Sequence, residues 1–316
     1  MSHFFTRLFS SSKHSSVGLH IAGSRVRLIA LVARDGNMIP VQVAETALPE
    51  GSVERGHIIN IESFVSFFKN FRTLHRFDRV HLAIREPEVI SSDPVETIPK
   101  KNVVPSATAA KATRKRYIEA FTRAGIIVDS FEYDSQAVAR AVVPSGTKGL
   151  SMIVDIGASE TSLSITSNGM AIYTAPIVFG GSMIITALTD ELGISIEEAH
   201  QVRRDHGLSS SGAHKDIFCA MEKGIAILRN EIDMHYIDWC GGTKKKKAGP
   251  AIDTVYLSGE YGSLQGLSEY LGASLKLHVV RADPWVNCLS YDQVIPILSA
   301  DESLIYTAAI GAALQV

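Results

Sequence analysis

The stretch IVDIGASETSLSI, residues 153–165, decides the fold class. An apolar strand runs into a turn of small residues around Gly157 and then directly into a second apolar strand. Gly157 lets the backbone approach an anion closely, and the turn amides can point inward as donors. Asp155 stands at the strand end, where a carboxylate can order a metal-bound water. The stretch therefore predicts a phosphate-holding hairpin, with an ordinary Gly- and Ser-rich turn as the alternative.

Two further segments repeat parts of this pattern. Residues 17–32, VGLHIAGSRVRLIALV, again predict strand, small-residue turn and strand. Residues 254–267, TVYLSGEYGSLQGL, predict a buried strand that ends in Ser258 and Gly259 before a helix begins. A helix N-terminus after a glycine turn is another place for a nucleotide. Two similar hairpins in one chain indicate a duplicated architecture.

The order of the three elements resembles the phosphate-1, phosphate-2 and adenosine motifs of the actin-like ATPase superfamily. Within it, the chain is most similar to the type IV pilus assembly protein PilM family, a relative of the cell-division protein FtsA, over most of residues 14–316. The connecting segments 117–142, 177–204 and 306–315 carry this resemblance. It implies an α/β, actin-like fold of two ribonuclease-H-like halves around a nucleotide cleft.

The resemblance also implies a domain organisation. We expect a flexible leader at 1–13, actin-like domain I at 14–149 and domain II at 150–316, with the last helix returning to domain I. Residues 86–113 contain four prolines with Ser, Lys and Ala between them, which argues against a long helix. We therefore expect 86–133 to be a reduced form of the extra subdomain that makes partner contacts in the family.

The composition is that of a soluble protein with no charge bias. Lys plus Arg number 31 and Asp plus Glu 33, so no global charge argues for a nucleic-acid partner. No apolar run reaches the roughly 18 residues of a membrane span, and the N-terminus lacks a signal-peptide centre. The cysteines at 219, 240 and 288 show no C-x-x-C spacing, and we expect them to be reduced. These features predict a cytoplasmic protein.

Two short segments each have two interpretations. The leader places Phe4, Phe5, Leu8 and Phe9 beside Arg7 and Lys13, which fits either an interfacial amphipathic helix or a partly docked tail; we prefer the tail. The loop 241–250 contains four successive lysines, which fit either an anionic surface or a solvated loop. For this loop we prefer the solvated interpretation.

The resemblance implies binding of ATP with Mg²⁺ between the domains, with slow hydrolysis at most. Asp155 would hold a magnesium-bound water, and both hairpins would bind the phosphates through backbone amides. The third motif would lie close to the adenosine. Asp134 would orient the attacking water, although it also fits a helix N-cap. The nucleotide-binding residues implied are Ala22, Gly23, Ser24, Arg25, Gly157, Ala158, Ser159, Thr161, Gly181, Arg203, Ser258, Gly259 and Gly262.

Three departures from the family pattern argue against catalysis. His20 replaces the Asp that the first hairpin usually presents to the metal, and imidazole is a poor ligand for Mg²⁺. His200 stands where a Glu toward the ribose is common, with Arg203 kept one turn on. Glu260 and Tyr261 add bulk and charge to a run of small residues beside the expected nucleotide. A pseudo-ATPase scaffold is therefore an alternative to an ATPase.

The expected role is that of a cytoplasmic assembly component of a type IV pilus-type machine. The resemblance implies that its partner is the cytoplasmic tail of a bitopic, PilN-like membrane protein, which would hold the chain at the inner face of the membrane. Direct membrane contact and nucleic acid are not expected; self-association is an open expectation.

Two other functions share the fold. An FtsA-like cytomotive filament protein is one, but the ending AAIGAALQV lacks a basic amphipathic tail. A sugar or metabolite kinase is the other, but the sequence shows no clear Asp, Asn and Glu cluster for a sugar.

Overall fold

A computed structural model describes residues 15–86, 107–208, 214–240 and 251–315. The chain divides into two compact units, one formed by residues 1–145 together with 283–316 and the other by residues 146–282. The predicted leader and the four-lysine loop lie outside the described residues. Within these residues, no helix combines the length and hydrophobicity that a membrane span requires.

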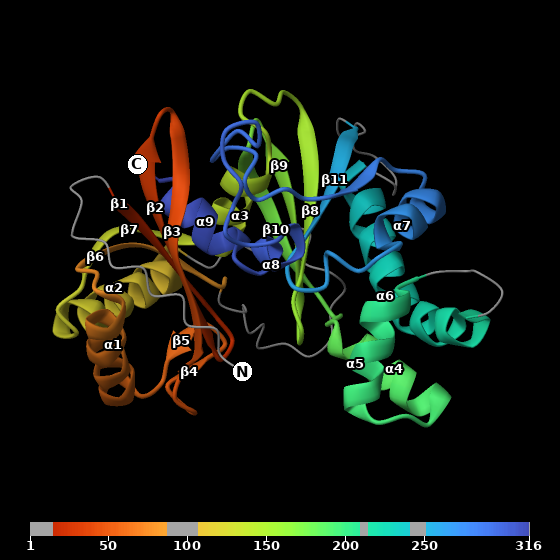
Figure 1. Cartoon of the computed structure of the whole chain (residues 1–316), viewed down its shortest axis with the longest axis horizontal. Coiled ribbons are helices and arrows are strands. Elements are labelled where there is room, and N and C mark those ends of the chain that lie inside the picture. Colours follow the sequence, from red (N-terminus) through yellow and green to blue (C-terminus); the bar gives the residue numbers. More distant parts are fainter. Residues whose placement is uncertain (1–14, 87–106, 209–213, 241–250, 316) are drawn as a thin grey trace. The chain divides into compact units, whose positions relative to one another are not determined.

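The first unit is built on a five-stranded sheet with the order β3-β2-β1-β6-β7 (Figure 1). Neighbours among the first three strands are antiparallel, whereas β6 is parallel to both β1 and β7. Its strands are β1 (Ser15–Ala22), β2 (Arg25–Arg34), β3 (Asn37–Ala47), β6 (Arg79–Ile84) and β7 (Ile127–Tyr133), and a separate ribbon is formed by β4 (Val53–Glu54) and β5 (His57–Ile58).

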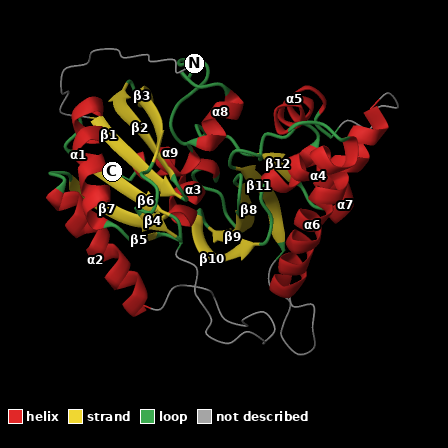
Figure 2. Ribbon diagram, turned by 90° about the horizontal axis from the view of Figure 1, so that it is seen from below, coloured by secondary structure: helices red, strands yellow, loops and turns green. Residues whose placement is uncertain are grey.

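Helices cover both faces of this sheet. Figure 2 shows α1 and α2 together along one face and α3 with α9 along the other. On the first face, the Phe64 ring meets Tyr117 and Phe121 edge-on, at centroid distances of 5.7 and 5.6 Å. The helices of the unit are α1 (Ile61–His75), α2 (Ala107–Arg123), α3 (Asp134–Val142), α8 (Ala300–Ile305) and α9 (Thr307–Ala313).

The second face is packed backbone against backbone. A Cβ atom on Gly18 of β1 would lie 1.9 Å from the Ala309 carbonyl oxygen, and one on Gly311 of α9 would lie 1.7 Å from the Ala137 carbonyl oxygen of α3. Only glycine permits such an approach. The helix α9 therefore sits directly on the strand and on the helix that it covers.

The region predicted as a reduced insertion, 86–133, belongs largely to this unit. Strand β7 pairs with β6 from Arg79 opposite Ile127 to Ile84 opposite Tyr133. Helix α2 buries Tyr117 and Phe121 in the core. Residues 107–133 thus complete the main sheet and its helical layer, because their aromatic residues fill the space beside α1. Residues 87–106 of the predicted insertion lie outside the described residues.

The segment after residue 282 also differs from the predicted division, which assigned it to domain II apart from the last helix. Residues 283–316 pack with the first unit. The Ser290 amide donates to Asn37 Oδ1 at 2.8 Å, and the Met38 amide donates to the Cys288 carbonyl at 2.6 Å. Asn287 Nδ2 donates to the Val143 carbonyl at 2.8 Å. These bonds join the segment to the start of β3 and to the end of α3.

The second unit repeats the topology of the first. Its five-stranded sheet has the order β10-β9-β8-β11-β12, with antiparallel neighbours among β8 to β10 and parallel pairing of β11 with β8 and β12. The elements are β8 (Leu150–Ile156), β9 (Thr161–Ser167), β10 (Met170–Ile177), α4 (Ser182–Leu192), α5 (Ile196–His206), α6 (Lys215–Cys240), β11 (Ile252–Ser258), α7 (Leu267–Leu275) and β12 (Val279–Arg281). The duplicated α/β architecture that the sequence predicts is confirmed.

The glycine contact of α9 gives a stability prediction. Changing Gly311 to Ala should lower the free energy of unfolding of the first unit by about 1–3 kcal/mol, because the methyl group overpacks the contact with α3. Urea unfolding can be followed by tryptophan fluorescence in a Trp239→Phe background, where the signal comes from Trp285 of the first unit.

Gly224→Ala in α6 is the matched control. A Cβ there would meet its nearest neighbour at an ordinary 3.5 Å, and alanine favours helix. Equal loss of stability in both variants would contradict the contact argument.

Candidate functional site

The first hairpin lies in the first unit at the β1–β2 turn. Ala22 pairs with Arg25, and Gly23 and Ser24 form the exposed turn, with Gly23 at φ +54°. The Ser24 carbonyl accepts the amide of Leu48 at 2.7 Å, which ties the turn to the end of β3. Arg25 lies 3.7 Å from the Glu45 carboxylate. The four predicted residues are therefore together at one strand end.

The second hairpin lies in the second unit, between β8 and β9. The Gly157 amide donates to the Glu160 carbonyl at 3.0 Å. The turn rests on the start of α4, where the amides of Gly181 and Ser182 donate to the carbonyls of Gly157 and Ala158 at 2.9 and 2.8 Å. Ala158 and Ser159 are exposed, and their amides meet no backbone acceptor in the described part of the chain. Exposed, unpaired turn amides of this kind suit an anion.

The third motif turns back over the end of β8. Gly259 has φ +82°, and a Cβ atom there would lie 2.6 Å from the Ile156 carbonyl oxygen. The Tyr261 amide donates to that same oxygen at 3.0 Å. A Cβ atom on Gly262 would lie 2.5 Å from the Ser258 carbonyl oxygen. These glycines serve close contacts between backbones of the second unit itself.

The Tyr261 ring lies inside this unit between two of the predicted nucleotide residues. It is 2% exposed. One side packs on Gly181, where a Cβ atom would lie 2.2 Å from the ring, and the Arg203 guanidinium carbon lies 4.6 Å from its centroid. The predicted residues Gly181 and Arg203 are thus both in contact with one aromatic side chain, which follows the predicted Gly259 by two residues.

Three other predicted residues occupy the strands. Asp155 is the second-last residue of β8 and pairs in register with Ser162 and Ser258 on the neighbouring strands. Thr161 is fully buried, and its Oγ1 has no hydrogen-bond partner within the described residues. Ser258 is also fully buried. Burial of Thr161 and Ser258 leaves their side chains no contact with a ligand on the surface of this unit. Among the described residues, no group of three His, Cys, Asp or Glu side chains is placed to hold a metal ion.

A buried charge cluster lies in the first unit, around Asp134. This residue is the first of α3 rather than its N-cap, which is Tyr133. Both Asp134 carboxylate oxygens are buried, and Oδ2 lies 3.6 Å from His20 Nε2 and 4.0 Å from Arg85 Nη1. The Glu86 carboxyl lies against the same carboxylate and accepts a hydrogen bond from Ser135. An aspartate enclosed in this way has no oxygen exposed to orient a water.

Two carboxyl groups in contact cannot both ionise easily. Burial and the negative charge of Asp134 raise the pKa of Glu86 well above its ordinary value. Burial opposes ionisation of Asp134 as well, but the polar groups of Glu86 and His20 beside it and the charge of Arg85 hold its pKa below the usual range. The pair therefore consists of a protonated Glu86 beside an ionised Asp134.

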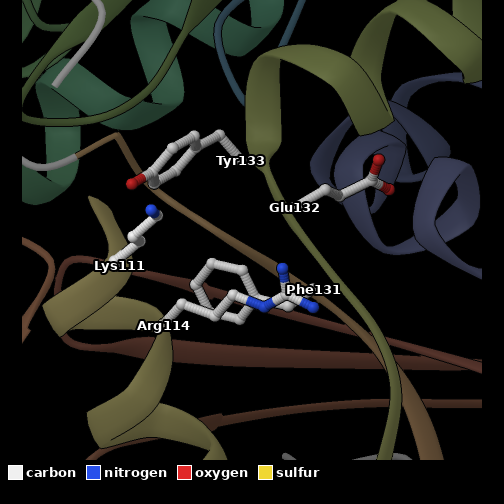
Figure 3. A pocket seen from close by; sticks show the side chains of 5 residues that line it. All are labelled: Lys111, Arg114, Phe131, Glu132 and Tyr133. Carbon is white, nitrogen blue, oxygen red and sulfur yellow. The ribbon is translucent and has the colours of Figure 1, made fainter. Parts of the chain in front are cut away.

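A pocket of about 220 Å³ opens elsewhere in the first unit, between α2 and β7. Figure 3 shows Lys111 and Arg114 from α2 projecting toward Phe131 and Tyr133 of β7. The Glu132 carboxylate points away from the two basic groups, and Arg140 binds it at 2.6 and 2.7 Å. The pocket therefore has aromatic walls and a net positive charge.

The sequence interpretation missed both the acid pair and the pocket. For Glu86 a signal existed, because it follows a parallel strand at its carboxyl end, where ligands and catalytic groups gather. For the pocket no local signal existed. Lys111 and Arg114 precede Phe131 by a helix and a turn, and only the packing of α2 on β7 brings them together.

Comparisons with solved structures identify the fold class of the protein. A structure described as the PilM–PilN type IV pilus biogenesis complex matches with a TM-score of 0.66 at 17% identity, over 95% of this chain and 98% of that one. MreB 5 of Spiroplasma citri bound to AMPPNP matches with a TM-score of 0.57 at 12% identity, over 95% of each chain. With the paired hairpins, these likenesses define an actin-like fold.

The family follows from sequence. A family sequence model described as type IV pilus assembly protein PilM matches residues 88–316. The cell division protein FtsA of Neisseria meningitidis serogroup B is 23% identical over 208 residues, which are 64% of this chain and 47% of that protein. The match thus spans about half the length of that relative. The chain belongs to the PilM family of type IV pilus assembly proteins.

The two halves of the predicted nucleotide site fit a nucleotide differently. The exposed amides of Ala158 and Ser159 fit phosphate oxygens. The space between Gly181 and Arg203 does not fit a base, because the Tyr261 ring fills it. The residues present therefore do not fit a complete nucleotide bound in the predicted way.

The acid pair gives a pH prediction. Folding raises the pKa of Glu86 above 4.5, so the folded chain keeps a proton that the unfolded chain releases. Its contribution to stability is thus complete below about pH 4.5 and is lost as the pH rises toward the folded pKa. Glu86→Gln, which is neutral at every pH and close in shape to a protonated Glu86, should remove this loss. Urea unfolding between pH 4.5 and 8 should show the variant gaining on the wild type as pH rises.

Glu50→Gln, at an exposed turn residue, is the control. A constant difference between Glu86→Gln and the wild type across this pH range would show that Glu86 is not protonated in the folded chain.

Proposed function

We propose that this chain is an assembly scaffold of a type IV pilus-type membrane machine, and that it works by binding a short peptide tail of a membrane-anchored partner. The observation that carries the proposal is membership of the PilM family over residues 88–316. The likeness to a chain of a PilM–PilN complex, over nearly the whole of both chains, supports a partner of the PilN kind. Such a partner would hold the chain at the inner face of the membrane, with no direct membrane contact required.

The α2–β7 pocket is the docking site that we assign to this tail. Among the strands that the structure describes, β7 lies at the edge of its sheet, and edge strands bind extended peptides through main-chain hydrogen bonds. The aromatic walls suit apolar side chains of the peptide. Lys111 and Arg114 make no hydrogen bond or ion pair within the described residues, so they suit carboxylates. The occupant is therefore an extended peptide that carries both apolar and acidic residues.

The Tyr133 hydroxyl adds a polar group at this site. It is buried and has no hydrogen-bond partner among the residues described. Burial, with the nearby Glu86 carboxyl, raises the pKa of Tyr133, so the hydroxyl stays protonated and able to donate at neutral pH. A peptide carbonyl or carboxylate in the pocket would give this donor an acceptor.

ATP with Mg²⁺ is not part of the proposed mechanism and stays a prediction. The exposed amides of the second hairpin support the phosphate half of that prediction. The buried ring of Tyr261 argues against the base half, and the burial of Asp134 argues against water activation there. Docking of the peptide requires neither nucleotide binding nor hydrolysis.

The proposal predicts that charge reversal in the pocket weakens docking. A synthetic peptide with the sequence of the cytoplasmic tail of the PilN-like protein from the same genome should bind the full chain in isothermal titration. Lys111→Glu combined with Arg114→Glu should weaken binding by about tenfold or more, which corresponds to about 1.4 kcal/mol. The loss should shrink at high salt, because the contact is electrostatic.

The control is Lys69→Glu combined with Lys215→Glu, which changes the net charge equally at exposed positions outside the pocket. Failure of the peptide to bind the wild type would refute the partner. Equal binding to both double variants would refute the docking site and leave the partner in place.

A further inference from the structure

Tyr261 stands where the family resemblance places the adenosine. Its neighbours in the second unit are Gly181 at the start of α4 and Arg203 on α5, both predicted nucleotide residues. The three come from separate parts of the unit and meet only in the folded chain. In this structure, Gly181 and Arg203 contact the ring of Tyr261.

The contact with Gly181 leaves no room for a second ring. A Cβ atom on Gly181 would lie 2.2 Å from Cγ and 2.3 Å from both Cδ atoms of Tyr261. Near-equal distances to three ring atoms mean that the face of the ring, not its edge, covers the glycine. A ring stacked on a peptide plane excludes any other planar group from that plane.

Arg203 completes the enclosure of the ring. Its guanidinium carbon lies 4.6 Å from the ring centroid, within the distance of a cation–π contact. Its Nε is buried and has no hydrogen-bond partner in the described part of the chain. A base or ribose would ordinarily offer such a group an acceptor, whereas a tyrosine ring offers only its face.

The backbone fixes the ring in this position. The Tyr261 amide donates to the Ile156 carbonyl at 3.0 Å, and the Gly262 amide donates to the Gly259 carbonyl at 3.0 Å. Gly259, at φ +82°, lies too close to Ile156 for any side chain. The ring therefore projects from a tight turn anchored on β8, and it is buried with the core residues of the unit.

We infer that Tyr261 is a built-in occupant of the base side of the site, so that the chain does not select nucleotides by their base. The actin-like scaffold of the second unit is filled by its own aromatic ring in place of adenine. Anions can still meet the exposed amides of Ala158 and Ser159. Triphosphate without a nucleoside should therefore bind as well as ATP does. This inference does not rest on the peptide site, which lies in the other unit.

The test compares two ligands and three proteins by isothermal titration of the full chain. The ligands are ATP and inorganic tripolyphosphate, each with Mg²⁺, and the proteins are the wild type, Tyr261→Phe and Tyr261→Ala. Wild type and Tyr261→Phe, which both keep the ring, should show no preference for ATP. Tyr261→Ala should gain affinity for ATP by about tenfold or more, the effect of one stacked base, with tripolyphosphate unchanged.

Two results would overturn the inference. One is a preference of about tenfold or more for ATP over tripolyphosphate in the wild type. The other is a folded Tyr261→Ala variant, verified by near-ultraviolet circular dichroism, that gains nothing for ATP. If that variant does not fold, the wild-type comparison decides alone: binding of ATP no tighter than tripolyphosphate, or of neither, supports the inference. Peptide binding, measured in the same samples without nucleotide, reports separately on the proposed function.

Discussion

The first unit depends on the contact of α9 with β1 and α3. Gly18 and Gly311 remove the side chains that would keep the backbones apart, and Ser16 Oγ donates to the Ala313 carbonyl at 2.6 Å. Two ends of the sequence, almost 300 residues apart, are joined in this way. Strand β1 carries both the first hairpin and His20, so the position of these groups relative to α3 follows from the contact. A methyl group at either glycine would move them.

The sequence predicted what local pattern encodes and missed what packing creates. The strand–turn–strand patterns around Gly157 and at residues 17–32 were enough to predict the duplicated fold. Prolines between 87 and 105 favoured a reduced extra subdomain at 86–133, yet α2 and β7 complete the main sheet. The reason is that Tyr117 and Phe121 pack against Phe64 of α1, and a local sequence pattern cannot predict a contact with such a distant helix.

The candidate site shows the same division. In the second unit, the predicted residues Gly181 and Arg203 both contact the Tyr261 ring, two residues after the predicted Gly259. The sequence motifs could not predict which individual side chains would be buried or protonated. His20 and Asp134 were each noted, but their enclosure with Glu86 depends on the strand order β1-β6-β7, which places three strand ends side by side. A buried acid pair then follows from geometry and from the cost of ionising two carboxyls in one place.

Arg140 of α3 links the pocket to the C-terminal helix. Its guanidinium binds the Glu132 carboxylate with two nitrogens, and Nη1 also donates to the Gly311 carbonyl at 2.8 Å. The planar fork of arginine serves both partners at once, which the single ammonium of lysine cannot match in geometry. Replacing Arg140 with lysine would therefore lose at least one of these contacts, although the charge is kept. Through this one side chain, the strand that lines the pocket is bonded to α9, so a displacement of α9 would strain the contact with Glu132.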